Sequence, residues 1–260
     1  MRALRLGWAY FRVIAANELQ YRVNLVLQIF NSAITLATGF VAISLVFSHT
    51  PELQGWTRGE LLVVMGLHIA VGGVIGALVR PGMSQFMQEI EEGTFDLALT
   101  KPADSQLLVS IRSFRIWQLV DVVVGSVVIA YGARTIEGIG GARLLAFLAA
   151  ATMGVIVLYC LWLGLATTAF KITRADSVFD MFDGMYQAGR WPVSIYPTWL
   201  RGTLTFVVPL AFAITVPAET LAARLGPSSL LVGLVATTAV VVGARWLWMR
   251  AIRSYSGASA

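Results

Sequence analysis

Six long apolar segments constrain the fold of this chain more than any other feature of its sequence. A stretch of about 20 apolar residues can cross the hydrocarbon core of a bilayer as an α-helix, which satisfies its own backbone hydrogen bonds there. Apolar residues make up 57% of the chain and charged residues 13%, about half the charged share of soluble domains. The sequence therefore predicts an all-α polytopic membrane protein with one six-helix transmembrane domain, residues 23–249. The predicted spans are residues 23–47, 60–79, 116–131, 144–170, 204–221 and 230–249.

Residues 1–22 precede the first span and have the pattern of an amphipathic helix. At 100° per residue, apolar and basic side chains fall on opposite faces. Trp8 and Phe11 lie on one face, and Arg5 and Arg12 lie on the other. This pattern predicts an interfacial helix with its arginines toward anionic lipid, and the aromatic side chains argue against a nucleic-acid arm. Residues 250–260 form a short polar tail.

The basic residues are distributed unevenly between the connecting segments. Fifteen of the 19 Lys and Arg residues fall in the N-terminus, in and around residues 81–115, in residues 171–201 and near the C-terminus. The other connections hold four. By the positive-inside rule we expect a bacterial plasma membrane protein with both termini and both large connections in the cytoplasm.

Five polar residues lie on one face of the first span, at positions i, i+4, i+7, i+11 and i+14. Lipid would penalise such a stripe, so it is expected to face either neighbouring helices or a polar translocation pathway. Both readings stay open from the sequence. The residues are Asn24, Gln28, Asn31, Thr35 and Thr38.

Two ionisable residues lie inside other predicted spans, and the sequence leaves open whether either is functional. His68 is isolated near the middle of the second span. Asp121 lies inside the third, where a carboxylate is costly unless it is paired. Arg80, Arg112 or Arg115 is the expected partner, because all three flank the same membrane surface.

The connection of residues 81–115 is the most acidic part of an otherwise basic chain. The pattern predicts a short helix at residues 83–92 that ends where Gly93 adopts a left-handed conformation. Residues 94–99 are expected to run extended into Lys101 and Pro102, which break helices.

Motifs for enzymatic chemistry are largely missing from the sequence. The single Cys160 excludes an intramolecular disulfide, and neither a phosphate-binding P-loop nor a metalloprotease motif is present. One constellation remains: Asp176, Asp180 and Asp183 share a helical face, as a Mg²⁺-dependent enzyme acting on a prenyl or phospholipid diphosphate requires. A solvated acidic helix face is the simpler interpretation.

Two stretches carry a resemblance to a known family. Residues 90–102 read IEEGTFDLALTKP, and residues 190–218 hold a proline-rich signature. Together with the layout of the spans, these stretches resemble the permease subunits of bacterial ABC exporters of the type-two class. The signature residues are Trp191, Pro192, Tyr196, Pro197, Pro209 and Pro217.

The resemblance implies a transporter subunit, not an enzyme, that works as a homo- or heterodimer of permeases in membrane lipid. Separate ABC ATPase subunits would bind ATP and Mg²⁺, so this chain is expected to hold no cofactor, no metal and no nucleic acid. In this family the connection between the second and third spans carries the coupling helix. The implied coupling residues are Gln88, Glu89, Glu91, Glu92, Gly93, Phe95, Asp96, Leu99, Lys101 and Pro102.

The scarcity of charge in the spans favours an amphiphilic or hydrophobic cargo for such an exporter. The resemblance itself does not select a substrate. Two alternatives stay open at this point, the lipid-diphosphate enzyme and a membrane scaffold or immunity protein without transport.

Overall fold

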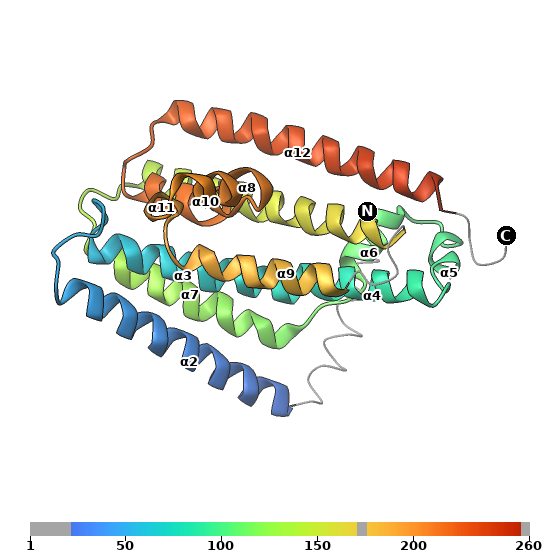
Figure 1. Ribbon diagram of the computed structural model, residues 1–260, viewed down its shortest axis with the longest axis horizontal. Coiled ribbons are helices and arrows are strands. Elements are labelled where there is room, and N and C mark those ends of the chain that lie inside the picture. The colour runs from blue at the N-terminus through green and yellow to red at the C-terminus, as the bar shows by residue number, and fades with distance from the viewer. Residues whose placement is uncertain (1–21, 171–175, 256–260) are drawn as a thin grey trace.

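The computed structural model describes residues 22–170 and 176–255, which are helical apart from turns and short loops. The predicted interfacial helix of residues 1–22 lies almost wholly outside the described residues. Long helices run roughly side by side along the long axis of the molecule (Figure 1). One end carries the loop that contains Trp56, and the opposite end carries the short helices that follow residue 91; we call these the Trp56 end and the projecting end.

Five helical stretches in the described part are long and apolar enough to cross a membrane. The stretches are α2 (Arg22–Phe47), α3 with its continuation (Arg58–Glu91), the stretch Ile116–Ala133 that contains α7 (Leu119–Ala133), α8 (Gly141–Ala166) and α12 (Pro227–Arg253).

The second long helix is continuous for 34 residues. It comprises α3 (Arg58–Val74), the π-helix η1 (Ile75–Val79) and α4 (Arg80–Glu91). Pro81 does not break it: the π-helix η1 ends just before this proline, and the helix continues as α4. The predicted helix of residues 83–92 is therefore the end of a span rather than a separate element.

The turn after α4 agrees with the sequence in part. Gly93 has φ +68°, the left-handed conformation predicted at this position. The prediction that residues 94–99 are extended is wrong, since they include the short helix α5 (Asp96–Leu99). The helix α6 (Ser105–Ile111) follows, and its N-cap Asp104 accepts a hydrogen bond from the backbone N–H of Leu107 at 3.1 Å. The 3₁₀ turn η2 (Ile116–Gln118) then leads into α7.

The core lies around α3, whose most apolar window is 72% buried, compared with 11% for α2 and for α12. Glycines allow α3 and α7 to approach closely. A Cβ on Gly66 would lie 2.7 Å from the carbonyl oxygen of Gly125, and one on Gly125 would lie 2.5 Å from that of Gly66. Side chains larger than hydrogen would separate the two helices, so this small-residue contact fixes their packing.

A second polar segment runs antiparallel to α3, contrary to the sequence prediction. It contains α9 (Asp176–Tyr186), followed by the 3₁₀ turns η4 (Gln187–Arg190) and η5 (Val193–Ile195). Asp183 contacts Arg80, the Tyr186 hydroxyl donates to the His68 carbonyl at 2.7 Å, and Ser194 accepts from Trp56 Nε1 at 3.0 Å. Residues 183–194 thus extend from the start of α4 to the Trp56 end. The described part of this connection, residues 176–201, is therefore not confined to one end of the bundle.

The span predicted at residues 204–221 is sharply bent in the structure. Two helical halves, Thr198–Val207 and Ala211–Leu221, meet at a bend of 83°. The first contains α10 (Thr198–Gly202) and η6 (Thr203–Val207), and the second η7 (Ala211–Thr215) and α11 (Val216–Leu221). Pro209 lies in the bend, where it lacks an N–H to continue a helix.

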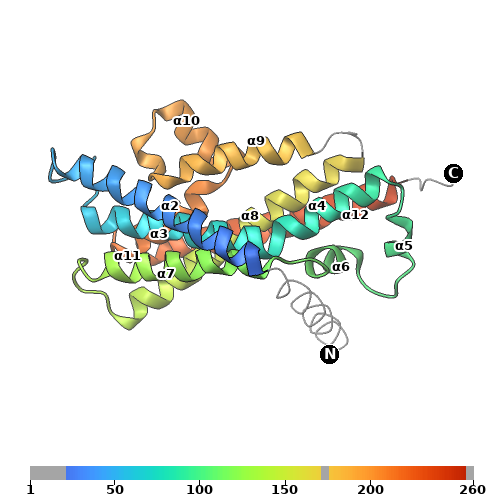
Figure 2. The ribbon, with the colours of Figure 1, turned by 90° about the horizontal axis from the view of Figure 1, so that it is seen from below.

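Both outer ends of this bent pair return to the Trp56 end. Arg201 donates to the Ser194 carbonyl at 2.5 Å, and Arg224 contacts Glu60 at 2.5 Å and packs over the Trp56 ring. Glu60 also completes the capping box that starts α3 with Thr57. The bent pair therefore enters the bundle and leaves it on the same side. Figure 2 shows α10 lying outside the row of long helices.

Candidate functional site

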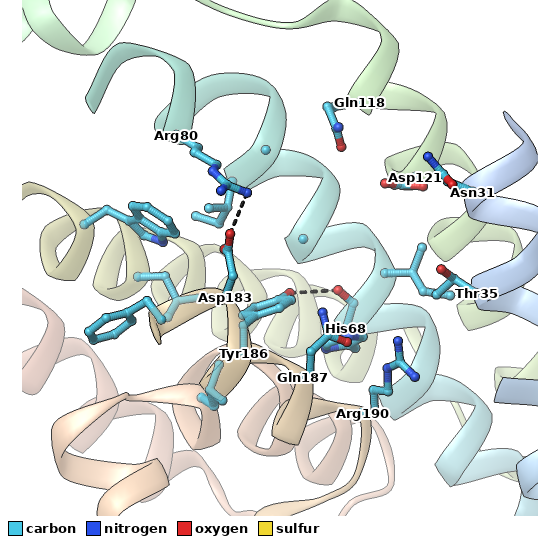
Figure 3. Close-up of a pocket in the computed structure, with 18 of the residues that line it drawn as sticks. Asn31, Thr35, His68, Arg80, Gln118, Asp121, Asp183, Tyr186, Gln187 and Arg190 are labelled. Atoms are coloured by element: carbon cyan, nitrogen blue, oxygen red, sulfur yellow. Dashed lines mark hydrogen bonds and ion pairs between the residues drawn. The ribbon is translucent and has the colours of Figure 1, made fainter. Parts of the chain in front are cut away.

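A polar cavity of about 320 Å³ lies among α2, α3–η1, α7, α8 and the α9–η4 segment (Figure 3). One wall is apolar and comes mainly from α8 and the bend of residues 208–210. The other walls carry the polar groups of the bundle. Those polar residues are Gln28, Asn31, Ser32, Thr35, His68, Arg80, Arg115, Gln118, Asp121, Asp183, Tyr186, Gln187 and Arg190.

Asp121 is held by side chains of α2. Gln28 Nε2 donates to one carboxylate oxygen at 2.7 Å, and the Ser32 hydroxyl donates to the other. The expected arginine partner is not used, because Arg80 pairs with Asp183 and Arg112 pairs with Glu89. Two neutral donors therefore satisfy this carboxylate and link α2 to α7.

The polar stripe of α2 divides between the cavity and the surface. Gln28, Asn31 and Thr35 line the cavity. Asn24 and Thr38 are exposed, and the Thr38 hydroxyl donates to the Ile34 carbonyl of its own helix at 2.9 Å. The stripe thus serves both helix contact, through Gln28, and cavity lining.

His68 lies at the wall of the cavity and is 5% exposed. Its ring stacks on Tyr186 with 4.7 Å between ring centroids. Nδ1 is buried without a hydrogen-bond partner, and it lies where Gly189 covers it, 3.4 Å from the position of a Cβ there. A larger residue at position 189 would press on the imidazole.

Two of the three aspartates on α9, Asp180 and Asp183, lie beside Arg80. Asp183 pairs with Arg80 at 2.6 Å, and Asp180, whose side chain is 80% exposed, lies 3.9 Å from the same guanidinium. The side chain of Asp176 lies outside the described part of the chain. Among the side chains that the structure describes, no group of three His, Cys, Asp or Glu residues could hold a metal ion. The described geometry neutralises this acidic face with an arginine.

Several cavity residues were not identified from the sequence. Ser32, Gln118, Tyr186, Gln187 and Arg190 all line it. The last three lie in residues 171–201, which their polarity assigned to the surface. The available signal was their spacing: Asp183, Tyr186, Gln187 and Arg190 recur at helical intervals on one face.

The projecting end carries the implied coupling residues (Figure 1). Glu89 and Phe95 are engaged inside the chain: the Glu89 carboxylate pairs with Arg112, and Phe95 is 0% exposed. Gly93 and Asp96 are partly buried. The others are exposed, namely Gln88, Glu91, Glu92, Leu99, Lys101 and Pro102.

An aromatic cluster attaches this end to the long helices. Phe86 on α4 lies 4.9 Å from Phe95 and 5.1 Å from Trp248 of α12, centroid to centroid. Arg245 of α12 adds a two-pronged contact to Asp104, at 2.5 and 3.0 Å. These contacts attach the short helices to α4 and α12.

The residues of the proline-rich signature lie in the turns that lead to the Trp56 end and in the bent pair of helical halves. Pro192 is buried, the Tyr196 hydroxyl donates to the Ala188 carbonyl at 2.8 Å, and Pro197 precedes α10. Pro209 lies at the bend and Pro217 near the start of α11. Trp191 is partly buried between these turns. These residues form turns and helix starts rather than a chemical site.

A bundle of long apolar helices around a polar cavity is the architecture of a multi-pass membrane protein. Residues 33–259 match the family model of the ABC-2 family transporter proteins. This match covers most of the chain, so the protein belongs to that family and is an ABC-2 type permease. Neither the comparison with curated proteins nor that with solved structures finds a match.

Proposed function

We propose that this chain is the permease subunit of an ATP-driven exporter in a bacterial plasma membrane, with the projecting end in the cytoplasm. Seven basic residues with described side chains lie toward that end and five toward the Trp56 end. The seven are Arg80, Lys101, Arg112, Arg115, Arg245, Arg250 and Arg253, and the five are Arg58, Arg134, Arg143, Arg201 and Arg224. The helix α12 also ends there, and α2 begins at its end nearer to the short helices (Figure 1).

The observation that carries the proposal is the continuity of α3, η1 and α4. His68, Gly72 and Arg80 line the cavity, and the same 34-residue helix ends at Glu91 in the projecting end. A rigid helix can transmit a movement at one end to side chains at the other, as a flexible loop cannot.

An ABC ATPase would bind at the tip formed by α4 and α5. Leu97 is 70% exposed and Leu99 is 38% exposed there, beside the exposed carboxylates of Glu91 and Glu92. Apolar side chains with a charged rim suit a protein interface. ATP and Mg²⁺ would bind to that partner and not to this chain.

A second permease, identical or homologous, would complete the transporter. The outward faces of α2 and α12 carry many exposed apolar side chains, including Phe30 at 63% and Val235 at 70%. Lipid or a second copy suits these faces. The cargo in this proposal is amphiphilic or hydrophobic, since the cavity joins a polar wall to an apolar one.

Copurification tests the proposal. The tagged chain is expressed together with the ABC ATPase encoded beside it, extracted in mild detergent and reconstituted in vesicles. We expect the ATPase to copurify and its ATP turnover to change when the permease is present. A Leu97→Asp variant should lose the ATPase, whereas Glu52→Lys, an exposed change in the loop at the Trp56 end, should keep it. Equal retention by both variants would place the docking site elsewhere.

A further inference from the structure

We propose that the cavity binds the negatively charged head group of an amphiphile through Arg190 and Arg115. This inference rests on the proposed transport function and names the class of its cargo. The carrying observation is a surplus of cationic side chains in a cavity at membrane depth.

Five ionised side chains line the cavity. Arg80 and Asp183 neutralise each other at 2.6 Å, and Asp121 is satisfied by Gln28 and Ser32. Arg115 and Arg190 have no ion pair with any side chain that the structure describes, and both are exposed to the space around them. The lining therefore carries an excess of positive charge.

Arg190 lies at membrane depth, where an arginine without an anionic partner among the described side chains indicates a binding site for an anion. It lies on η4 between Tyr186, which is bonded to His68, and Ser194, which is bonded to Trp56. Figure 3 shows its guanidinium beside His68 and Gln187 at the cavity. An arginine within a membrane is costly, and such residues face water-filled cavities or charged ligands and mark substrate pathways.

Arg115 lies at the other end of the same cavity, toward α4. Its backbone N–H donates to the Ala77 carbonyl at 2.9 Å, which places it beside the end of η1. Three other residues of the cavity lining, Gln118, Asn31 and Thr35, add neutral hydrogen-bonding groups. Guanidinium groups bind phosphate or carboxylate through paired N–H donors, so this set favours an anion over a cation.

The opposite wall indicates that the anion belongs to an amphiphile. Leu158, Leu161 and Trp162 of α8 face the polar groups, together with Val208 and Leu210 of the bend. Leu161 also lines a groove of about 520 Å³ between α8, α12 and the bent pair, whose other lining residues are almost all apolar. An amphiphile would place its charged head group in the cavity and its hydrocarbon chain along this groove, and Leu161 would contact both parts.

Calorimetric titration of the purified permease in dodecyl maltoside tests the proposal without the ATPase. The probes are short-chain phosphatidic acid, short-chain phosphatidylcholine and inorganic phosphate. We expect phosphatidic acid to bind at least about tenfold more tightly than either of the others. Arg190→Gln and Arg115→Gln should each weaken that binding about tenfold, and Arg190→Lys should weaken it less, because it keeps the charge.

The matched control is Arg134→Gln, which removes an exposed arginine at the end of α7, outside the cavity. Its affinity should equal that of the wild type, and size-exclusion profiles of all variants should agree. Equal affinity for the two lipids, unchanged binding by the Arg115→Gln/Arg190→Gln double variant, or equally tight binding of inorganic phosphate would each overturn the proposal. ATPase copurification is not used, so failure here is separate from failure of the exporter assignment.

Discussion

Glu89 on α4 and Arg112 at the end of α6 form an ion pair with 2.5 Å between Oε2 and Nη1. Their side chains are 20% and 7% exposed, so the pair is largely removed from solvent. Two other guanidinium nitrogens of Arg112 are buried without a partner in the described structure. The pair fixes α6 against α4, so the Glu89 carboxylate is engaged within this chain. The Glu91 and Glu92 side chains are exposed on the same helix end, where Glu92 accepts a hydrogen bond from its helical neighbour Gln88 at 2.7 Å, so both can face a partner.

Charge reversal should separate these two roles. Glu89→Lys leaves Arg112 beside a like charge, so we expect a loss of about 3 kcal/mol in the free energy of unfolding. Glu91→Lys/Glu92→Lys should leave that free energy within about 0.5 kcal/mol of wild type and weaken ATPase copurification. Unfolding by SDS in mixed micelles measures the first effect. Glu52→Lys, an exposed change at the Trp56 end, is the control. Equal stability of all three variants would show that the Glu89–Arg112 pair does not hold the projecting end.

The contact between Asp121 and α2 should appear as a measurable coupling energy. Hydrogen bonds between transmembrane helices contribute on average about 0.6 kcal/mol each. A double-mutant cycle of Gln28→Ala and Asp121→Ala should therefore give a coupling energy of about 0.5–1.5 kcal/mol. Thr38→Ala, whose hydroxyl bonds only within α2, should show no coupling to Asp121→Ala. A coupling of zero for the Gln28 cycle would mean that this hydrogen bond does not join the helices.

The contact between Asp104 and Arg245 should depend on pH. The hydrogen bond from Arg245 lowers the pKa of the Asp104 carboxyl below its ordinary value of 3.8. A carboxyl with a lowered pKa stabilises the folded state above that ordinary value and loses its contribution as the pH falls through the folded-state pKa. The side chains are 42% and 43% exposed, so the contribution is about 0.2–1 kcal/mol.

The comparison of wild type with Asp104→Asn, from pH 7 down to about pH 3, measures this contribution. The stability difference should be present at neutral pH and shrink in acid. Since Asp104 also caps α6, a pH-independent part of the difference should remain. A difference that grows as the pH falls would contradict the assigned direction of the pKa shift.

The sequence predicts the long helices well and the polar segments poorly, for a physical reason. The length and apolar content of α2, α8 and α12 alone decide that they can cross a membrane. Residues 176–195 contain too much charge to satisfy that criterion. Their Asp183 and Tyr186 are instead accommodated by Arg80 and by the backbone of His68. Such compensation depends on neighbours in space, which a single sequence does not reveal.

The candidate site shows the same division. Periodicity predicts that Gln28, Asn31 and Thr35 share a face, and all three line the cavity. The partner of Asp121 was wrong, because proximity to a membrane surface says little about which helices touch. The positions of prolines in the sequence also fail to predict where a helix bends. Pro81 lies within a continuous helix, whereas Pro209 lies at a bend of 83°, although a π turn precedes each of them.

The path of residues 183–201 gives a topological prediction. Ser194 contacts Trp56, and Arg201 contacts Ser194, so the exposed Thr198 at the start of α10 should face the side of the membrane opposite the projecting end. The count of basic residues placed the same segment in the cytoplasm. Single cysteines made in a Cys160→Ala background separate these two arrangements.

A membrane-impermeant maleimide added to intact cells should label Thr198→Cys and also Glu52→Cys, the control at the Trp56 end. It should label Gln88→Cys, which is exposed on α4, only after the membrane is opened. Labelling of Thr198→Cys that follows Gln88→Cys instead of Glu52→Cys would refute the crossing by residues 183–194. It would also move Arg190 out of the depth at which an anionic head group is proposed to bind.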